Sequence, residues 1–268
     1  MAYPFSCRAR NSLALCGTVI ASICIWLLPL FRPLKNVSAA AAPPQPVLVE
    51  LFTSEGCSSC PPADALLARL DAAQFVPGAR AIVLSEHVTY WNYLGWSDPF
   101  SFEAMSDRQQ KYGSHFGLDS VYTPQAVVDG EAQVLGSDPN ALALAVSRAA
   151  ARSKMVLKFA SVQRNGNTVT LSVRADGSVK GMLTVALAEN VTVSSVRKGE
   201  NAGRTLHHVA VVRTLKEMGS EALDGRTLTL NLPTPSSSPG QDSGLRVVAF
   251  VTNNRTGAVQ AITEQTIP

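Results

Sequence analysis

The feature that most constrains this chain is a pair of cysteines, Cys57 and Cys60, lying between two segments of different periodicity. The apolar run from Val47 to Phe52 precedes the pair and has the length of a buried strand. The segment from Ala63 to Phe75 follows it, with leucines at helical spacing. Two prolines come directly after Cys60, where a first helical turn tolerates them because its amide hydrogens lack intrahelical partners. The sequence therefore predicts that the pair lies where a buried strand passes into a helix.

This position favours redox chemistry. A thiol attacks a disulfide only as the thiolate, and a helix N-terminus stabilises that anion through free amide hydrogens and the positive end of the helix dipole. We predict that Cys57 is the nucleophile and that Cys60, three residues later, closes a disulfide that resolves a mixed disulfide with a substrate. A bare C-x-x-C spacing also occurs in structural cysteines and as half of a zinc site, and both alternatives stay open.

A change of composition follows the second predicted strand, Ala81 to Ser85. Residues 86–122 are aromatic and polar, with a helical stretch from Glu103 to Phe116, which indicates an insertion. His87, Trp91 and Trp96 in this insertion are candidates to cover the cysteines, with a titrating group and an apolar wall. Packing in the core is the alternative, because aromatic clusters more often fill space than bind substrates.

The pattern returns to strand after the insertion. Thr123 and Pro124 introduce the predicted strand Gln125 to Val128, and the pair Asp129-Gly130 is typical of a hairpin turn. A helix is predicted over residues 140–153. The order of these elements predicts an α/β fold in which residues 43–154 form a thioredoxin-like domain with a helical insertion.

The remainder of the chain is rich in predicted strands. Turn signals separate several of them, and the spacing predicts an antiparallel β-sandwich-like C-terminal domain over residues 155–268. The seven predicted strands are Val156 to Val162, Thr168 to Val173, Leu183 to Leu187, Leu206 to Val212, Thr227 to Leu232, Leu245 to Val251 and Ala258 to Ile262.

Residues 1–42 have the pattern of an export signal. Basic residues precede an uncharged apolar run, and an alanine-rich stretch suitable for cleavage follows it. An uncleaved membrane anchor is the alternative, because the run approaches the length that spans a bilayer. Three of the five cysteines, Cys7, Cys16 and Cys24, lie in this segment, so its removal leaves only Cys57 and Cys60 to pair with each other. We predict a secreted or periplasmic protein.

The charge balance gives no indication of a polyanionic partner. The formal net charge of the whole chain is +3, but residues 1–42 carry four basic side chains and no acidic one, which leaves −1 for the rest. The sequence therefore predicts no binding to nucleic acid and, after cleavage of the signal, none to a membrane.

Three long stretches carry a family resemblance: Glu50 to Asp64 (ELFTSEGCSSCPPAD), His87 to Phe100 (HVTYWNYLGWSDPF) and Val121 to Gly130 (VYTPQAVVDG). They closely resemble a secreted, thioredoxin-like bacterial family known as domain of unknown function 1223. The stretch Gly199 to Arg213 (GENAGRTLHHVAVVR) resembles the C-terminal region of that family, so the resemblance covers nearly the whole chain after residue 42. The family implies a fold but no established substrate.

The wider resemblance to thioredoxins implies roles for single residues. It implies a cis peptide bond between Thr123 and Pro124 beside the cysteines, with the Thr123 backbone pairing with an extended substrate and Pro124 keeping a metal from bridging the sulfurs. It also implies that Glu50 accepts the proton of the resolving cysteine. Thioredoxins carry this acid one position nearer the first cysteine, so an exposed or ion-paired Glu50 is the alternative.

Three functions follow from these expectations. The first is an extracytoplasmic thiol-disulfide oxidoreductase or redox partner, acting on protein thiols and disulfides with an unidentified electron partner and no cofactor. The second is a copper or other metal-binding or delivery protein that uses the two cysteines with a histidine such as His87, since thiolate and imidazole suit copper(I). The third is a non-enzymatic binding protein that acts through its β-rich part.

Overall fold

The computed structural model describes residues 43–223, 228–233 and 244–267. In these ranges the strands are β1 (Gln45–Thr53), β2 (Ala79–His87), β3 (Gln125–Val128), β4 (Ala132–Leu135), β5 (Met155–Asn165), β6 (Thr168–Ala175), β7 (Met182–Ser195), β8 (Thr205–Gly219), β9 (Leu228–Pro233), β10 (Leu245–Thr252) and β11 (Val259–Ile267). The helices are α1 (Pro61–Ala73), α2 (Glu103–Phe116) and α3 (Pro139–Ala150), with short 3₁₀ turns η1 (Asn92–Leu94) and η2 (Ser220–Leu223). The structure thus confirms each helix and strand that the sequence predicts.

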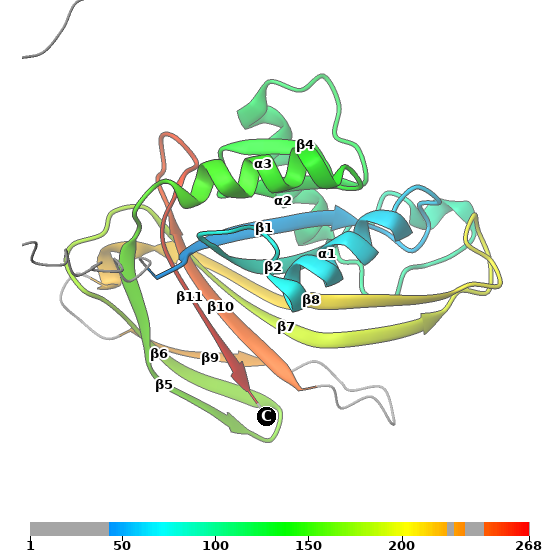
Figure 1. Ribbon diagram of the computed structural model, residues 1–268. Helices are drawn as coiled ribbons and strands as arrows, with labels where there is room; N and C mark the ends of the chain where they lie inside the picture. The colour runs from blue at the N-terminus through cyan, green and yellow to red at the C-terminus, as the bar shows by residue number, and fades with distance from the viewer. Residues whose placement is uncertain (1–42, 224–227, 234–243, 268) are drawn as a thin grey trace, which may run out of the picture. The chain divides into compact units, whose positions relative to one another are not determined.

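The way in which these elements assemble is different from the prediction. The strands form one mixed sheet in the order β4-β3-β1-β2-β8-β7-β10-β11-β5-β6-β9 (Figure 1). The predicted fold class, a thioredoxin-like domain with a helical insertion followed by a separate sandwich, is therefore wrong. The link between the two halves is the parallel pairing of Ser85 in β2 with Val211 in β8. Because β2 is almost entirely buried, a free edge there would leave its backbone unpaired, and β8 covers it.

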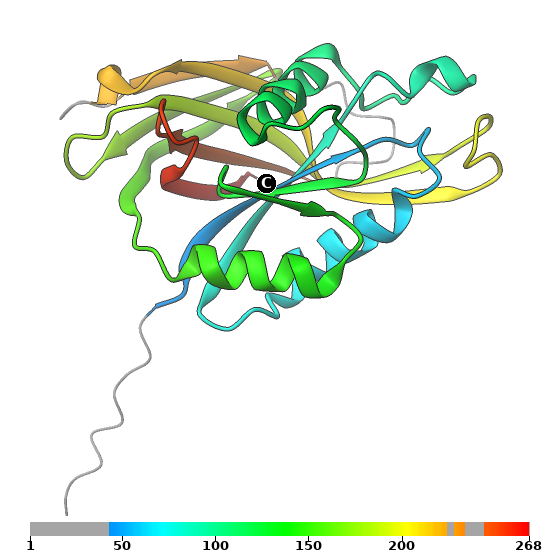
Figure 2. The same cartoon turned by 90° about the horizontal axis from the view of Figure 1, so that it is seen from above.

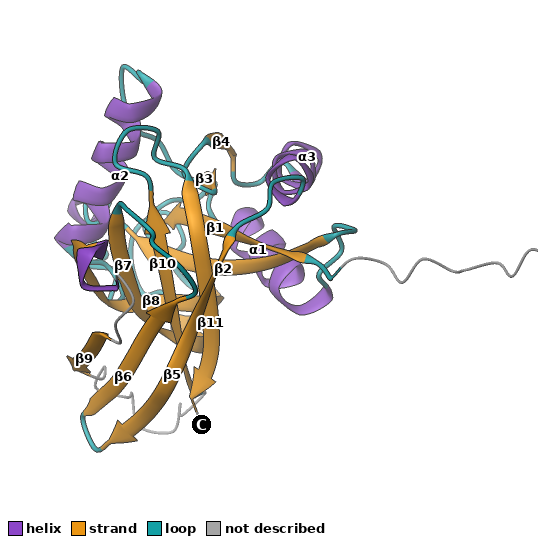
Figure 3. Cartoon of the chain, turned by 90° about the vertical axis from the view of Figure 1, so that its left-hand side faces the viewer, coloured by secondary structure: helices purple, strands orange, loops and turns teal. Residues whose placement is uncertain are grey.

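Helices cover both faces of the sheet around β1 and β2. Helices α1 and α3 pack on one face through a cluster that includes Leu51, Leu67 and Val146. Helix α2 lies on the other face, where Met105 joins a cluster with Leu48 and strands of the C-terminal half. Figures 2 and 3 show the strands between these two helical layers. Burial on both faces explains why β1 and β2 have continuous apolar runs.

Local signals explain where the helices begin and end. Asp138 accepts hydrogen bonds from the amides of Asn140 and Ala141 (2.9 and 3.0 Å) at the start of α3. Gly117, with a φ of 66°, ends α2 in the left-handed conformation. The carboxyl ends of the parallel strands β1 and β2 meet at one edge, so Thr53 at the end of β1 lies opposite His87 at the end of β2, and the cysteine loop follows from there.

Candidate functional site

Cys57 and Cys60 form a disulfide that closes the loop between β1 and α1, with their Cα atoms 5.4 Å apart. Both cysteines have 0% of their surface exposed, whereas Ser58 and Ser59 between them are exposed. The Sγ atom of Cys57 lies 3.3 Å from the Ser59 hydroxyl. The two predicted catalytic cysteines are therefore joined, but the surrounding chain covers the sulfur atoms.

The start of α1 offers fewer hydrogen-bond donors than expected. Cys60 is the N-cap residue, and Pro61 and Pro62 fill the first two helical positions, so these positions have no amide hydrogen. The next two amides, of Ala63 and Asp64, donate to the Cys60 carbonyl oxygen at 2.8 and 3.1 Å. The helix dipole still points at the pair, but the free amide hydrogens that the sequence led us to expect are missing from its first turn.

The tip of the β7–β8 hairpin holds the loop between the cysteines. The Asn201 side-chain amide donates to the carbonyl oxygens of Glu55 and Cys57, both at 2.9 Å. The Glu200 carboxylate accepts a 3.0 Å hydrogen bond from the Ser58 amide. In Figures 1 and 2 the hairpin extends past the other strands to the start of α1. Residues from the C-terminal half thus form part of the site.

Three further candidate residues, Trp91, Thr123 and Pro124, also gather at this end of the sheet. The Trp91 indole donates to the Thr123 hydroxyl at 2.7 Å. Trp91 also packs closely on Gly56, where an added Cβ atom would lie 3.0 Å from the Trp91 Cβ atom. The Thr123–Pro124 peptide bond is cis, as the resemblance implies. Gly136 lies between this group and α1. If this residue carried a Cβ atom, that atom would lie 3.3 Å from the Cβ atom of Ala63 and 3.3 Å from the Cβ atom of Pro124.

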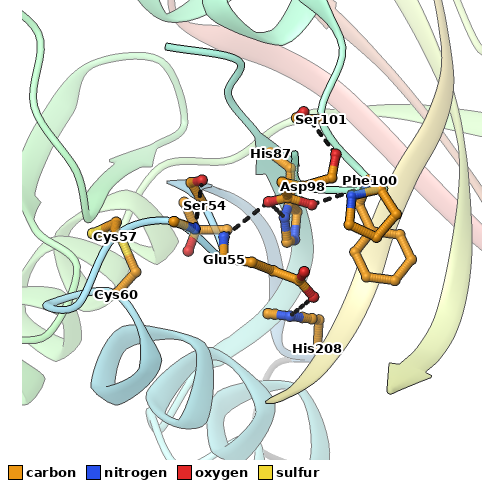
Figure 4. A network of polar contacts seen from close by, with 12 residues as sticks. Ser54, Glu55, Cys57, Cys60, His87, Asp98, Phe100, Ser101 and His208 are labelled. Atoms are coloured by element: carbon orange, nitrogen blue, oxygen red, sulfur yellow. Dashed lines mark hydrogen bonds and ion pairs between the residues drawn. A yellow bond between two sulfur atoms is a disulfide. The ribbon is translucent and has the colours of Figure 1, made fainter. Parts of the chain in front are cut away.

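Trp96 belongs to a buried polar network centred on Glu55, and Figure 4 shows the network members Glu55, Asp98, His87 and His208 beside the cysteines. The Trp96 indole donates to Glu55 at 2.8 Å, and the Glu55 amide donates to Asp98 at 2.8 Å. Asp98 also lies 2.7 Å from Nδ1 of His87. Although burial raises the pKa of Asp98, the neighbouring His87 and two backbone amides lower it by more. His87 and Trp96 therefore fix the segment before Cys57 rather than contact the sulfurs.

His208 completes this network from β8. Its Nε2 atom lies 3.3 Å from Glu55 and its Nδ1 atom 3.6 Å from Asp64. The Asp64 carboxylate in turn accepts a 2.9 Å hydrogen bond from the Thr53 hydroxyl. Burial lowers the pKa of His208, but the hydrogen bonds and charges of Asp64 and Glu55 raise it to about 10. His208 is thus an imidazolium at neutral pH.

We expect the ion-paired His208 to make the protein less stable as the pH becomes alkaline. Because the folded-state pKa of about 10 is above the ordinary value of 6.5, the stabilisation is complete below pH 6.5 and is lost as pH rises through 10. His208→Gln is expected to lower the free energy of unfolding by on the order of 2 kcal/mol at neutral pH, and the difference should narrow towards pH 10. Urea denaturation across this range measures it. His207→Gln, on the exposed side of the same strand, is the control, and equal curves for the two variants would contradict the assignment.

Glu50, the predicted proton acceptor, lies on the other face of β1. It forms an ion pair with Arg108 of α2 at 2.6 Å and accepts a 2.6 Å hydrogen bond from the Tyr112 hydroxyl. Glu86 on β2 joins this network, 3.7 Å from Arg108. Burial and the charge of Glu50 raise the pKa of Glu86 well above its ordinary value. The structure therefore places Glu50 with α2 and not with the cysteines, which lead into α1.

Two other expectations concern a metal and the membrane. Within the described ranges, no group of three or more His, Cys, Asp or Glu side chains is arranged to hold a metal ion. None of the helices in those ranges has the length and hydrophobicity needed to cross a bilayer. The predicted export signal, residues 1–42, lies outside the described residues.

Sequence reasoning missed several residues of the site. Glu200 and Asn201 reach the cysteine loop from more than 140 positions away, and no local pattern indicates that contact. The two residues and His208 do fall within the stretch Gly199 to Arg213 that carries the family resemblance. That stretch was the one available signal that this segment belongs to the site.

Comparison with known proteins identifies a family and one similar structure. A family model described as a protein of unknown function, DUF1223, matches residues 48–252. A crystal structure of a protein from Agrobacterium tumefaciens is 27% identical, with 85% of this chain and 96% of that chain covered and a TM-score of 0.61. A β-glucuronidase from Bacteroides uniformis matches 42% of this chain and 13% of its own at 13% identity, and its TM-score of 0.18 is too low to carry an argument. No curated protein matches the chain.

Proposed function

We propose that this chain, which belongs to the DUF1223 family of proteins of unknown function, exchanges thiols and disulfides with protein substrates through Cys57 and Cys60. The observation that carries the proposal is the disulfide itself, formed by two cysteines three positions apart at the start of α1. A disulfide that closes so short a loop contributes only about 2 kcal/mol to stability through chain entropy. Chemistry is therefore a better explanation of the pair than stabilisation.

The exchange needs both cysteines. In the dithiol form, the Cys57 thiolate attacks one sulfur of a substrate disulfide, that bond breaks, and the departing substrate sulfur takes up a proton. Cys60 then attacks the Cys57 sulfur, the Cys57–Cys60 bond forms, and the second substrate sulfur departs and is protonated. Two electrons pass to the substrate, and the reverse sequence starts from the disulfide form. Thr123, Pro124 and Trp91, which gather beside α1, are the proposed substrate-contacting residues.

The partners and the location follow from this chemistry. Substrates are protein thiols and disulfides, and an electron partner must restore the pair after each turnover. We propose that the protein works outside the cytoplasm, because disulfides persist in oxidising compartments and because residues 1–42 have the pattern of an export signal. The alternative of metal delivery gains no support, because His87 faces Asp98 and not the cysteines.

Reversible exchange in the folded state tests the proposal. Dithiol and disulfide forms of the protein are incubated separately in the same glutathione buffer, thiols are trapped, and the two forms are counted by mass spectrometry. We expect both samples to converge on one ratio while circular dichroism stays that of the folded protein. Samples that keep their starting states, or that react only after unfolding, would show that the disulfide is structural.

Access to the buried sulfurs is expected to depend on the hairpin tip. Asn201→Ala removes both hydrogen bonds that tie the tip to the backbone around Cys57. We expect a small water-soluble phosphine to reduce the disulfide about tenfold faster in this variant than in the unchanged protein. Without the two hydrogen bonds, the cysteine loop opens more easily. Thiol trapping over time gives the rate. Lys198→Ala, an exposed residue of the same hairpin, should leave it unchanged. Equal rates for both variants would contradict a role of the tip in access.

A further inference from the structure

One peptide unit inside the cysteine loop is held at both of its polar ends. The bond between Cys57 and Ser58 has its carbonyl oxygen bound by the Asn201 amide and its N–H bound by the Glu200 carboxylate, at 2.9 and 3.0 Å. This N–H follows the proposed nucleophile directly and would otherwise be available to stabilise a thiolate. The hairpin tip therefore occupies a donor that the reduced, ionised form of Cys57 would use.

The remaining surroundings also disfavour a thiolate. The sulfurs are buried, which penalises a charged form but not a neutral disulfide. Pro61 and Pro62 remove two amide donors from the helix start. In the described part of the chain, no lysine, arginine or histidine side chain hydrogen-bonds either sulfur, and the Ser59 hydroxyl makes a side-chain hydrogen bond to Cys57.

The charged groups nearest the motif are mostly acidic. Glu200 bears directly on the loop, and its pKa is lowered by its hydrogen bonds with Ser58, so it is a carboxylate at neutral pH. Behind the loop, Glu55 and Asp64 share the single imidazolium of His208. The Arg204 guanidinium donates to the Asn201 side-chain oxygen at 2.8 Å. Asn201 therefore stands between this positive charge and the Cys57–Ser58 peptide unit. Local charge therefore opposes a thiolate more than it supports one.

We infer that the Cys57–Cys60 pair is an electron donor, whose substrates are disulfides in other proteins, and that the tip residue Glu200 favours this direction. The inference rests on the proposed function. A pair becomes an oxidant when its reduced form is stabilised as a thiolate, and here that stabilisation is withheld. Each turnover oxidises the Cys57 and Cys60 thiols to the disulfide and reduces one substrate disulfide to two thiols. A separate dithiol donor must then reduce the pair again.

The ratio of dithiol to disulfide form at equilibrium tests the proposed direction of electron transfer. The folded protein is equilibrated from both starting forms in glutathione buffer with about 1 mM each of thiol and disulfide, and then in buffers of decreasing disulfide content. We expect nearly all of the protein to be in the disulfide form in the first buffer. A large dithiol population there would overturn the inference while leaving the exchange function intact. Failure of the two starting forms to converge would instead overturn the proposed function.

A charge-removing variant tests the role of Glu200. Glu200→Gln keeps a hydrogen-bond acceptor for the Ser58 amide but removes the negative charge, and we expect it to shift the equilibrium about threefold towards the dithiol form. The matched control is Glu131→Gln, in the turn at the opposite end of β1 from the cysteines, which should equilibrate like the unchanged protein. An unshifted equilibrium in Glu200→Gln would overturn the assignment of direction to this residue.

Discussion

Cys57→Ser is expected to abolish disulfide exchange, with a rate at least about 100-fold below that of the unchanged protein, because serine is not a usable nucleophile towards a disulfide. Cys60→Ala is expected to behave differently: Cys57 still attacks, but the mixed disulfide is no longer resolved and accumulates. Intact-mass spectrometry after incubation with glutathione disulfide separates the two outcomes, since only Cys60→Ala should gain one glutathione.

The different roles of Cys57 and Cys60 follow from their positions in the loop. Cys57 is followed by the exposed residues Ser58 and Ser59, whereas Cys60 caps α1 and is followed by two prolines. Ser58→Ala, which keeps the backbone amide, is the control and should react like the unchanged protein. Equal adduct formation by Cys57→Ser and Cys60→Ala would contradict the assignment of nucleophile and resolver.

The second large effect is expected at Arg108, in the buried network on the other face of the sheet. Arg108 pairs with Glu50 at 2.6 Å and with Glu217 at 2.8 Å, and it donates to the Tyr112 hydroxyl at 3.1 Å. Although burial lowers the pKa of Arg108, the carboxylates of Glu50 and Glu86 and the phenol of Tyr112 raise it well above its ordinary value. Arg108→Met should lower the free energy of unfolding by roughly 3–5 kcal/mol, because it leaves buried carboxylates unpaired.

Lys111→Met is the matched control for this prediction. Lys111 pairs with the same Glu217 at 3.1 Å but is exposed, so its loss should cost less than about 1 kcal/mol. Urea denaturation of both variants gives the comparison. Adding Glu50→Gln to Arg108→Met should recover part of the loss, because it removes the unpaired charge. Equal stabilities of Arg108→Met and Lys111→Met would show that the network does not stabilise the sheet.

The helices and strands were predictable because each has a local signal. The apolar runs of β1 and β2, the turn at Asp129-Gly130 and the prolines in the first turn of α1 act over a few residues. The pairing of β2 with β8 has no such signal, because the hydrogen bonds of an edge strand can be satisfied by any strand that reaches it. The predicted fold class, a thioredoxin-like domain followed by a separate β-sandwich-like domain, therefore failed at Ser85 and Val211, where the two halves pair in one sheet.

The candidate site divides in the same way. Cys57 and Cys60 were predictable, because their spacing carries a chemical reason, whereas the cis bond between Thr123 and Pro124 was implied by the resemblance to thioredoxins. Glu50 was placed with the cysteines by analogy, but side chains alternate along a strand, and a difference of one position turns it to the face that α2 covers. The hairpin tip contacts the loop through side chains remote in sequence, which no reading of local pattern can find.

Exchange of disulfides with other proteins should be visible as catalysis. Catalytic amounts of the protein are added to insulin with dithiothreitol as electron donor, and the loss of insulin disulfides is followed with time. We expect many turnovers for the unchanged protein and only the background rate of dithiothreitol for Cys57→Ser. A rate equal to background with the unchanged protein, or one that Cys57→Ser does not lower, would contradict exchange with other proteins.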